Sequence, residues 1–397
     1  MTEIYAIILF LFVLFFLLGT GVWVGLALMG VAWVGMELFT TRPVGDAMIT
    51  TIWASSSSWT LTALPLFIWM GEILYRTRLS EDMFKGLSPW LARLPGGLVH
   101  TNIVGCTVFA AVSGSSAATL TTVGKMSIPE LRSRNYPEKM IIGTLAGAAT
   151  LGLMIPPSLA LIVYGVTVNE SITKLFFAGV MPGLVLAVMF MSYVAVISWT
   201  SKDWNPVVET GMSFADKVKN SRFLLPVFAL ITVVIGSMYL GFATATEAAA
   251  IGVIGALTLA LFQGSLNWFS FRESLMGAMR TSAMIALILA GAAFLKLSMG
   301  FTGLPRALAD GIGAMELTRI DLIWFGIFVV VVVEMAQITP PIGFNLFVLQ
   351  GMTDHEMGYI TRAALPMFAI MVLMVFLLIW FPEIATWLPE NLRKGPV

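Results

Sequence analysis

The chain has 397 residues, of which 58% are hydrophobic and 11% are charged, and its 22 basic and 22 acidic residues cancel to a formal net charge of zero. This composition is typical of a membrane protein and excludes an ordinary soluble domain. The balanced charge offers no nucleic-acid-binding surface, and one cysteine with two histidines excludes an internal disulfide or a metal centre of these residues.

Apolar stretches long enough to cross a bilayer recur along the whole chain. A helix needs about 20 apolar residues to span a hydrocarbon core of roughly 30 Å. We therefore expect an all-α polytopic membrane protein. The expected apolar segments are residues 4–38, 60–75, 139–166, 174–199, 222–264, 320–349 and 362–387.

Two polar stretches, 80–94 and 265–280, mix aromatic and charged residues at roughly helical spacing. This pattern predicts amphipathic helices that lie along the membrane surface. The alternative is that both stretches are ordinary solvent-facing loops.

A run of small hydroxylated residues, SGSSAAT, occupies positions 113–119. Arginines and lysines precede and follow it, which places both flanks on the cytoplasmic side. The intervening segment, 97–130, is short for two full crossings. We therefore expect a re-entrant helical hairpin with SGSSAAT at its tip.

An internal repeat relates the two halves of the chain at an offset of 184 residues. GLMIPPS at 152–158 corresponds to AQITPPI at 336–342, so that two adjacent prolines recur, and Pro182 corresponds to Pro366. Thr60 and Thr62 likewise correspond to threonines in the second half. Matches in one register are typical of transporters built from duplicated units.

The repeat predicts two units of similar organisation, each with scaffold helices, an amphipathic helix, a hairpin and a broken helix. The first covers residues 1–199 and the second 200–397. In the first unit the amphipathic helix is expected at 80–94, the hairpin at 97–130 and the broken helix at 139–166. In the second they are expected at 265–280, 281–305 and 320–349, with the hairpin tip at Gly291–Ser298.

Adjacent prolines inside a membrane helix remove backbone donors and leave carbonyl groups without their usual partners. Such carbonyls, together with serine hydroxyls, are hard oxygen ligands that suit a sodium ion. Ser113, Ser115 and Ser116 are candidates to join carbonyls freed near Gly152 and Ile155. Small residues in membrane helices also serve close packing alone, but four hydroxylated residues in seven beside a broken helix favour the ion site.

Charged residues at membrane depth are functional candidates by default. Glu247 and Glu334 lie beside repeat motifs, where each has either a structural hydrogen-bonding role or an ion-coupling role. Lys296, inside the expected second hairpin, either meets a substrate carboxylate or extends its amine to the membrane surface.

Several motifs together resemble the large membrane subunit of tripartite ATP-independent periplasmic (TRAP) transporters, the DctM-like family. They are AVSGSSAAT, GLMIPPSLALIVYG, ALPLFIWMGEIL, ATATEAAAIG and the late run LPMFAIMVLMVFLLIWFPEIATWLP. The resemblance implies a sodium-driven importer, not an enzyme, with inverted repeats and an elevator mechanism in the bacterial inner membrane. It also implies three partners: a small four-helix membrane subunit, a periplasmic substrate-binding protein, and a small organic acid such as a C4-dicarboxylate or sialic acid.

The resemblance also implies two sodium sites and no other cofactor. Ser113, Gly152, Ile155 and Pro157 would form the first site. Ala336, Thr339 and Pro341 would form the second. The chain departs from the family pattern at Ala245, where the usual residue is proline, and at Lys296, where an apolar or aromatic residue is usual.

The number of membrane-spanning segments counted between the two proline pairs disagrees with an inverted repeat. Three apolar segments, 174–199, 222–241 and 244–264, lie between the proline pairs, and an odd number would orient both broken helices alike. We expect the miscounted crossing within 200–264.

Two other functions remain open: a sodium/carboxylate or ion exchanger that needs no binding protein, and, in another class, an intramembrane enzyme or a structural membrane subunit.

Overall fold

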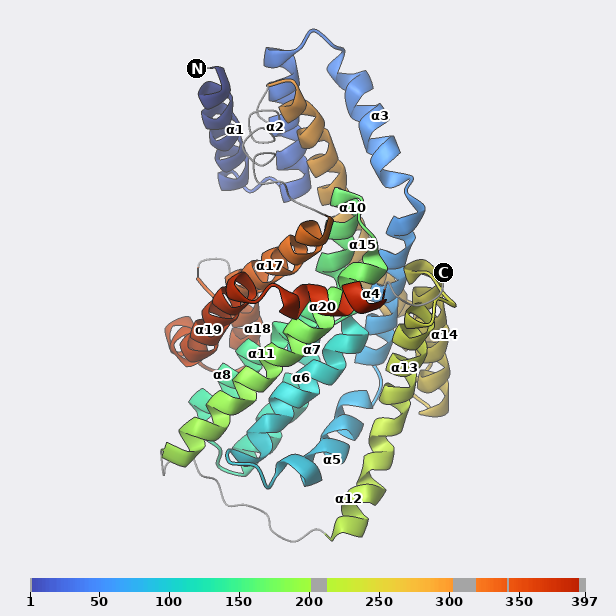
Figure 1. The fold of residues 1–397 in the computed structure, drawn as a ribbon, viewed down its shortest axis with the longest axis vertical. Helices are drawn as coiled ribbons and strands as arrows, with labels where there is room; N and C mark the ends of the chain where they lie inside the picture. Colours follow the sequence, from blue (N-terminus) through green and yellow to red (C-terminus); the bar gives the residue numbers. More distant parts are fainter. Residues whose placement is uncertain (1, 201–212, 303–318, 341–342, 393–397) are drawn as a thin grey trace. The chain divides into compact units, whose positions relative to one another are not determined.

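A computed structural model describes residues 2–200, 213–302, 319–340 and 343–392, and throughout these ranges the chain forms helices and turns without strands (Figure 1). Six helical runs in these ranges are long and apolar enough to cross a membrane. The predicted class, an all-helical polytopic membrane protein, is confirmed at this level. The six runs are Glu138–Val168, Ile172–Thr200, Phe214–Tyr239, Ala245–Phe262, Trp268–Gly300 and Met357–Trp380.

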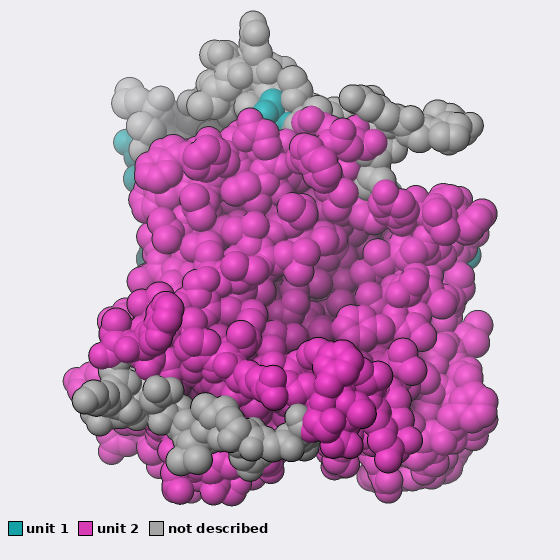
Figure 2. Space-filling model, turned by 60° about the horizontal axis from the view of Figure 1, so that its bottom comes forward, with its two compact units in different colours: residues 1–65, 278–321 teal, residues 66–277, 322–397 magenta. Residues whose placement is uncertain are grey.

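The chain divides into two compact units (Figure 2). The smaller contains residues 1–65 and 278–321, and the larger contains residues 66–277 and 322–397. Each unit therefore combines segments from both halves of the sequence. This division reflects which residues pack together in space. The predicted boundary at 199/200 instead separates the two sequence repeats, and that boundary stays a prediction.

The smaller unit consists of three N-terminal helices, a short 3-10 helix and the second half of a long helix. Its core contains Ala32, Met36, Val44 and Phe294, all buried. Arg42 lies over the ring of Phe301, with 5.3 Å between the guanidinium carbon and the ring centre. The helices are α1 (Thr2–Gly19), α2 (Val24–Phe39), α3 (Val44–Ser56), η1 (Trp59–Thr62) and α15 (Trp268–Gly300).

Helix α15 corrects part of the prediction for the second repeat. It runs without interruption over the range where an amphipathic helix at 265–280 and a hairpin from 281 were expected, so the predicted tip at Gly291–Ser298 is wrong. No proline interrupts this helix, and a side chain on Gly291 would fall 2.5 Å from the carbonyl oxygen of Gly25. Gly291 is therefore a packing position and not a helix break. Residues 303–305 of the predicted hairpin lie outside the described ranges.

The larger unit holds most of the described helices. Helix α8 lies at its centre, where nearly every residue is buried and where α8 packs against α6, α7 and α19. The helices are α4 (Ala63–Tyr75), α5 (Leu79–Leu91), η2 (Gly97–Val99), α6 (His100–Ser113), α7 (Ser116–Ser133), α8 (Glu138–Ala149), α9 (Leu151–Met154), α10 (Leu159–Val168), α11 (Ile172–Thr200), α12 (Phe214–Ser221), η4 (Arg222–Leu224), α13 (Leu225–Tyr239), α14 (Ala245–Phe262), α17 (Arg319–Gln337), α18 (Phe344–Met352), α19 (Met357–Trp380) and α20 (Glu383–Leu392).

Three elements of the first repeat lie at the expected positions in the chain. Helix α5 covers residues 80–91 of the amphipathic stretch predicted at 80–94, and it buries Met83, Phe84 and Leu87 while Lys85 is exposed. Helices α6 and α7 pack against each other over the expected hairpin 97–130. Helices α8, α9 and α10 form the expected broken helix, with the break between Met154 and Leu159.

The second proline pair also coincides with a break, because α17 ends at Gln337 and α18 begins at Phe344. Between the two breaks, α13 and α14 lie within 200–264 as counted from the sequence, and α15 is an additional helix of membrane length. The expectation of a miscounted crossing within 200–264 stays a prediction, and residues 201–212 of this range lie outside the described residues. The relative orientation of the two broken helices stays a prediction.

The close approach of α8 and α19 generates a prediction about stability. A side chain on Gly143 would clash with the carbonyl oxygen of Ala363, whereas one on Gly358 in α19 would meet no atom within 4 Å. Gly143→Ala is expected to destabilise the protein, because overpacking costs about 1–3 kcal/mol. Gly358→Ala is the control and should stabilise the helix by about 0.5–1 kcal/mol. Equal midpoints of thermal unfolding for the two detergent-solubilised variants would contradict this packing.

Candidate functional site

The turn between α6 and α7 is formed by glycine and serine residues whose local geometry explains their presence. Gly114 ends α6 in the left-handed conformation, with φ +60°, which favours glycine. Ser115 caps α7, where its hydroxyl accepts a hydrogen bond from the amide of Ala118 at 3.4 Å. The Ser113 hydroxyl pairs with that of Thr119 at 2.7 Å. We call residues 113–116 the hairpin tip.

The break after α9 follows from its two prolines. Pro156 and Pro157 have no amide hydrogen, so the carbonyls of Gly152 and Leu153 lose their usual helical donors. The hydroxyl of Ser158 donates to the carbonyl oxygen of Leu153 and accepts from the amide of Leu161 at 3.2 Å. Ser158 therefore closes one half of the broken helix and caps the next. We call residues 152–158 the first break.

The hairpin tip packs directly on the first break. A side chain on Gly152 would fall 2.7 Å from backbone atoms of Ser115 and Ser116, and one on Gly114 would fall 2.5 Å from the carbonyl oxygen of Pro157. The amide of Leu159 donates to the carbonyl oxygen of Gly114 at 3.4 Å. The structure thus brings together the two segments whose juxtaposition the sequence predicted, and their backbones touch because both carry glycine.

A carboxylate from the second repeat completes this contact. Oε1 of Glu334, in α17, accepts hydrogen bonds from the Ser116 hydroxyl at 2.7 Å and from the Leu153 amide at 3.1 Å. The Glu334 side chain is fully buried. Hairpin tip, first break and α17 therefore meet at one side chain. The sequence placed Glu334 only beside the second proline pair, and no local pattern could have revealed its partners.

The candidates for the second site are less completely described. The Thr339 hydroxyl donates to the carbonyls of Met335 at 3.1 Å and of Ala336 at 3.4 Å, and Pro341 lies outside the described residues. Asn345, in the first turn of α18, is fully buried, and neither of its side-chain polar atoms has a partner among the described residues. Sequence reasoning missed Asn345, although an amide directly after a proline-broken apolar helix is a usable signal.

The remaining two candidates, Glu247 and Lys296, are exposed side chains. Glu247 is exposed and forms a capping box at the start of α14, where its Oε2 accepts from the backbone amide and the hydroxyl of Thr244, both at 2.8 Å. These contacts give Glu247 a structural role, and its coupling role stays a prediction. Lys296 belongs to the smaller unit, where it is exposed on α15.

The chemistry of the tip contact suits a hard cation. No cluster of three or more His, Cys, Asp or Glu side chains occurs within the described ranges. The oxygens gathered at the tip and first break belong to serine and threonine hydroxyls, backbone carbonyls and one carboxylate. Ligands of this kind favour alkali and alkaline-earth ions over zinc or copper.

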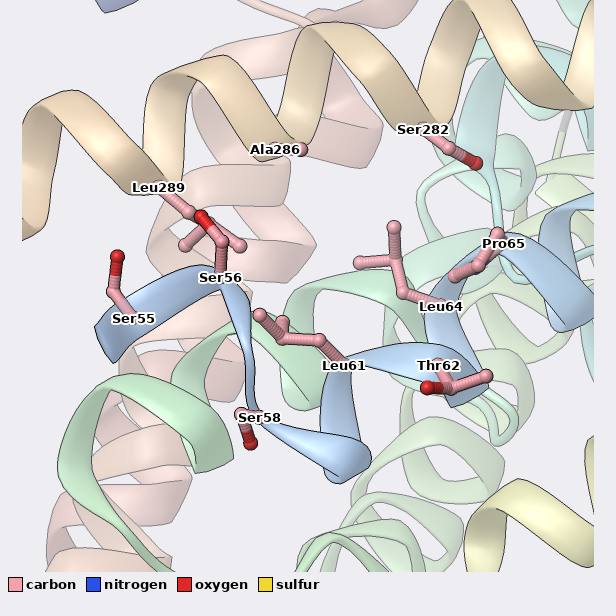
Figure 3. Close-up of a pocket in the computed structure, with 10 residues that line it drawn as sticks. All are labelled: Ser55, Ser56, Ser58, Leu61, Thr62, Leu64, Pro65, Ser282, Ala286 and Leu289. Carbon is pink, nitrogen blue, oxygen red and sulfur yellow. The ribbon is translucent and has the colours of Figure 1, made fainter. Parts of the chain in front are cut away.

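The smaller unit contains a separate cavity of about 270 Å³. Figure 3 shows side chains of α15 facing the segment that joins α3 to α4. Within the described ranges, no charged side chain lines this cavity and the buried hydroxyl of Ser282 has no partner. Such a lining suits a small polar solute. The lining residues are Ser55, Ser56, Ser58, Leu61, Thr62, Leu64, Pro65, Ser282, Ala286 and Leu289.

Comparison with known proteins identifies similar membrane proteins along almost the whole chain. Residues 11–319 and 312–384 match the family described as "Tripartite ATP-independent periplasmic transporter, DctM component". The chain is 30% identical to the C4-dicarboxylate TRAP transporter large permease protein DctM of Pseudomonas aeruginosa, over 85% of this chain and 88% of that protein.

Two further relatives carry other substrate names. The chain is 26% identical to the sialic acid TRAP transporter large permease protein SiaM of Vibrio cholerae, over 90% of this chain and 97% of that protein. It is 25% identical to the ectoine/5-hydroxyectoine TRAP transporter large permease protein UehC of Ruegeria pomeroyi, over 87% of this chain and 89% of that protein. The similarity therefore extends across relatives named for chemically different solutes.

The tip contact predicts a local change when Gly152 is enlarged. Gly152→Ala should push the hairpin tip from the first break and speed amide hydrogen exchange at residues 115–118 by about tenfold, equivalent to about 1.4 kcal/mol of local opening. Gly105→Ala in α6 is the control, because its side chain would have an ordinary contact of 3.6 Å with Val123. Wild-type exchange at these amides in Gly152→Ala would refute the direct backbone contact.

Proposed function

Because the chain belongs to the tripartite ATP-independent periplasmic transporter family as its DctM component, we propose that it is the large membrane subunit of a sodium-coupled importer of a small organic acid. The family consists of transport subunits and not of enzymes, which removes the intramembrane enzyme as an alternative. The proposal concerns the coupling ion, the solute and the way the subunit moves.

The observation that carries the proposal is the backbone contact between the hairpin tip and the first break. In hydrocarbon each unsatisfied backbone group costs several kcal/mol, so a proline-broken helix requires compensating partners. Serine hydroxyls and carbonyls at this contact are suitable ligands for sodium. We assign the first sodium to Ser113, Gly152, Ile155 and Pro157, and the second to Ala336, Thr339 and Pro341.

The transport cycle that we propose is an elevator movement. A body that contains the hairpin tip and the first break would carry the solute past fixed scaffold helices. Sodium would bind at the tip and favour the closed arrangement of tip and break, because a ligand that prefers one state shifts the population toward it. The family resemblance supports this cycle.

We propose three partners and one location. In the bacterial inner membrane, a small four-helix subunit would complete the membrane complex, and a periplasmic binding protein would deliver the solute. The relatives are named for C4-dicarboxylates, sialic acid and ectoine, so a small carboxylate-bearing solute is the class that we propose. The delivering protein would determine which member of the class is taken up.

Uptake into proteoliposomes tests this function. The subunit and its small partner are reconstituted with an inward sodium gradient and a candidate carboxylate, with and without the binding protein. Uptake is expected only when both sodium and the binding protein are present. Uptake without the binding protein would favour the exchanger alternative, and uptake that is indifferent to sodium would refute sodium coupling.

Ser113→Ala provides a narrower test of the first sodium site. Loss of one oxygen ligand is expected to raise the half-saturating sodium concentration for uptake by about tenfold, equivalent to about 1.4 kcal/mol. Ser133→Ala at the far, exposed end of α7 is the matched control and should behave as the wild type. Sodium dependence that is unchanged in Ser113→Ala would remove this hydroxyl from the site.

A further inference from the structure

Glu334 has one carboxylate oxygen that the hydrogen bonds at the tip contact leave unused. The Ser116 hydroxyl and the Leu153 amide both donate to Oε1, whereas Oε2 is buried and has no hydrogen-bond partner in the part of the chain that the structure describes. The whole residue is 0% exposed. A buried polar atom without a partner is uncommon and requires an explanation.

No cationic side chain among the described residues forms an ion pair with this carboxylate. The ion pairs found within the described ranges join other residues, including Glu72 with Arg76 and Glu138 with Arg132, and none includes Glu334. A buried carboxylate without a counter-charge is strongly unfavourable, so such groups pair, coordinate a cation or stay protonated. The first possibility is absent here, which leaves a bound cation or a proton.

The neighbours of Glu334 favour a bound cation. Both groups that fix Oε1 belong to the hairpin tip and to α9, where Gly152 brings the backbone of Ser116 into contact. The missing amide hydrogens of Pro156 and Pro157 leave this region rich in oxygen acceptors and poor in donors. A cation would satisfy both the partnerless Oε2 and the Gly152 carbonyl, which has lost its helical donor.

We propose that Oε2 of Glu334 is a direct ligand of the sodium ion held between the hairpin tip and the first break, and that its carboxylate supplies the negative charge of that site. This inference rests on the proposed function and deepens it. It adds a residue of the second repeat to a site otherwise made from the first. Because Ala336 follows Glu334 in α17 and Thr339 lies just beyond the end of this helix, the two proposed sodium sites then share one segment of the chain.

The test compares sodium-induced stabilisation of the purified full-length chain with and without this charge. Thermal unfolding midpoints are measured against sodium chloride, with choline chloride keeping the ionic strength constant. Glu334→Gln keeps an oxygen for Ser116 and Leu153 but removes the charge. The midpoint of the wild type is expected to rise with sodium, and the half-effective sodium concentration of Glu334→Gln is expected to be at least about tenfold higher.

Glu170→Gln is the matched control. The Glu170 side chain is only 9% exposed and its Oε1 lies 3.9 Å from Nζ of Lys174 in the segment that joins α10 to α11. The same chemical change there should leave the sodium response as in the wild type. An equal loss of response in both variants would mean that any removed carboxylate weakens the response, and would overturn the assignment to Glu334.

Two results separate this inference from the proposed function. A wild-type sodium response in Glu334→Gln would overturn the role of Glu334 and leave sodium coupling intact. A wild-type protein without any sodium response would contradict sodium coupling itself. If Glu334→Gln does not fold, Glu334→Asp replaces it, because aspartate keeps the charge on a shorter side chain. Glu334→Asp should raise the half-effective sodium concentration severalfold. An unchanged concentration would overturn the inference.

Discussion

The packing of the hairpin tip on the first break is the contact on which the rest of the site depends. A membrane helix interrupted by two prolines exposes backbone groups that the hydrocarbon interior does not satisfy. Here the Ser158 hydroxyl donates to the freed carbonyl of Leu153. A turn that contains no side chain larger than serine packs on the break, and Gly114 and Gly152 allow the two segments to approach within backbone contact. Larger residues at either glycine would separate the two segments and leave the break unsupported.

Glu334 extends this local contact across the chain. Its two hydrogen bonds join elements that are 218 and 181 residues away in sequence, so the site of the first repeat is tied to the helix that leads into the second break. In the sodium site that we propose, a charge at this position would make sodium binding and closure of the tip on the break energetically dependent on each other. In a symporter that dependence is useful, because the ion then controls which arrangement of the mobile parts is populated.

The sequence predicted the elements with strong local signals. Adjacent prolines located both helix breaks, and the Gly–Ser turn flanked by basic residues located the hairpin tip. It failed where the signal was weak: the repeat alone placed a second hairpin tip at Gly291–Ser298, but Gly291 is a packing position in α15, which continues to Gly300. It also could not find the partners of Glu334 or the buried Asn345, because such contacts are set by tertiary packing and not by local pattern.

A pair of experimental structures, one determined in sodium and one in a sodium-free choline buffer, tests the central claim most directly. The account predicts ion density in sodium that is bonded to Oε2 of Glu334 and to oxygens of the hairpin tip and first break, and predicts its loss in choline together with separation of tip and break. A tip that remains closed on the break in both buffers, with no density beside Glu334, would contradict it.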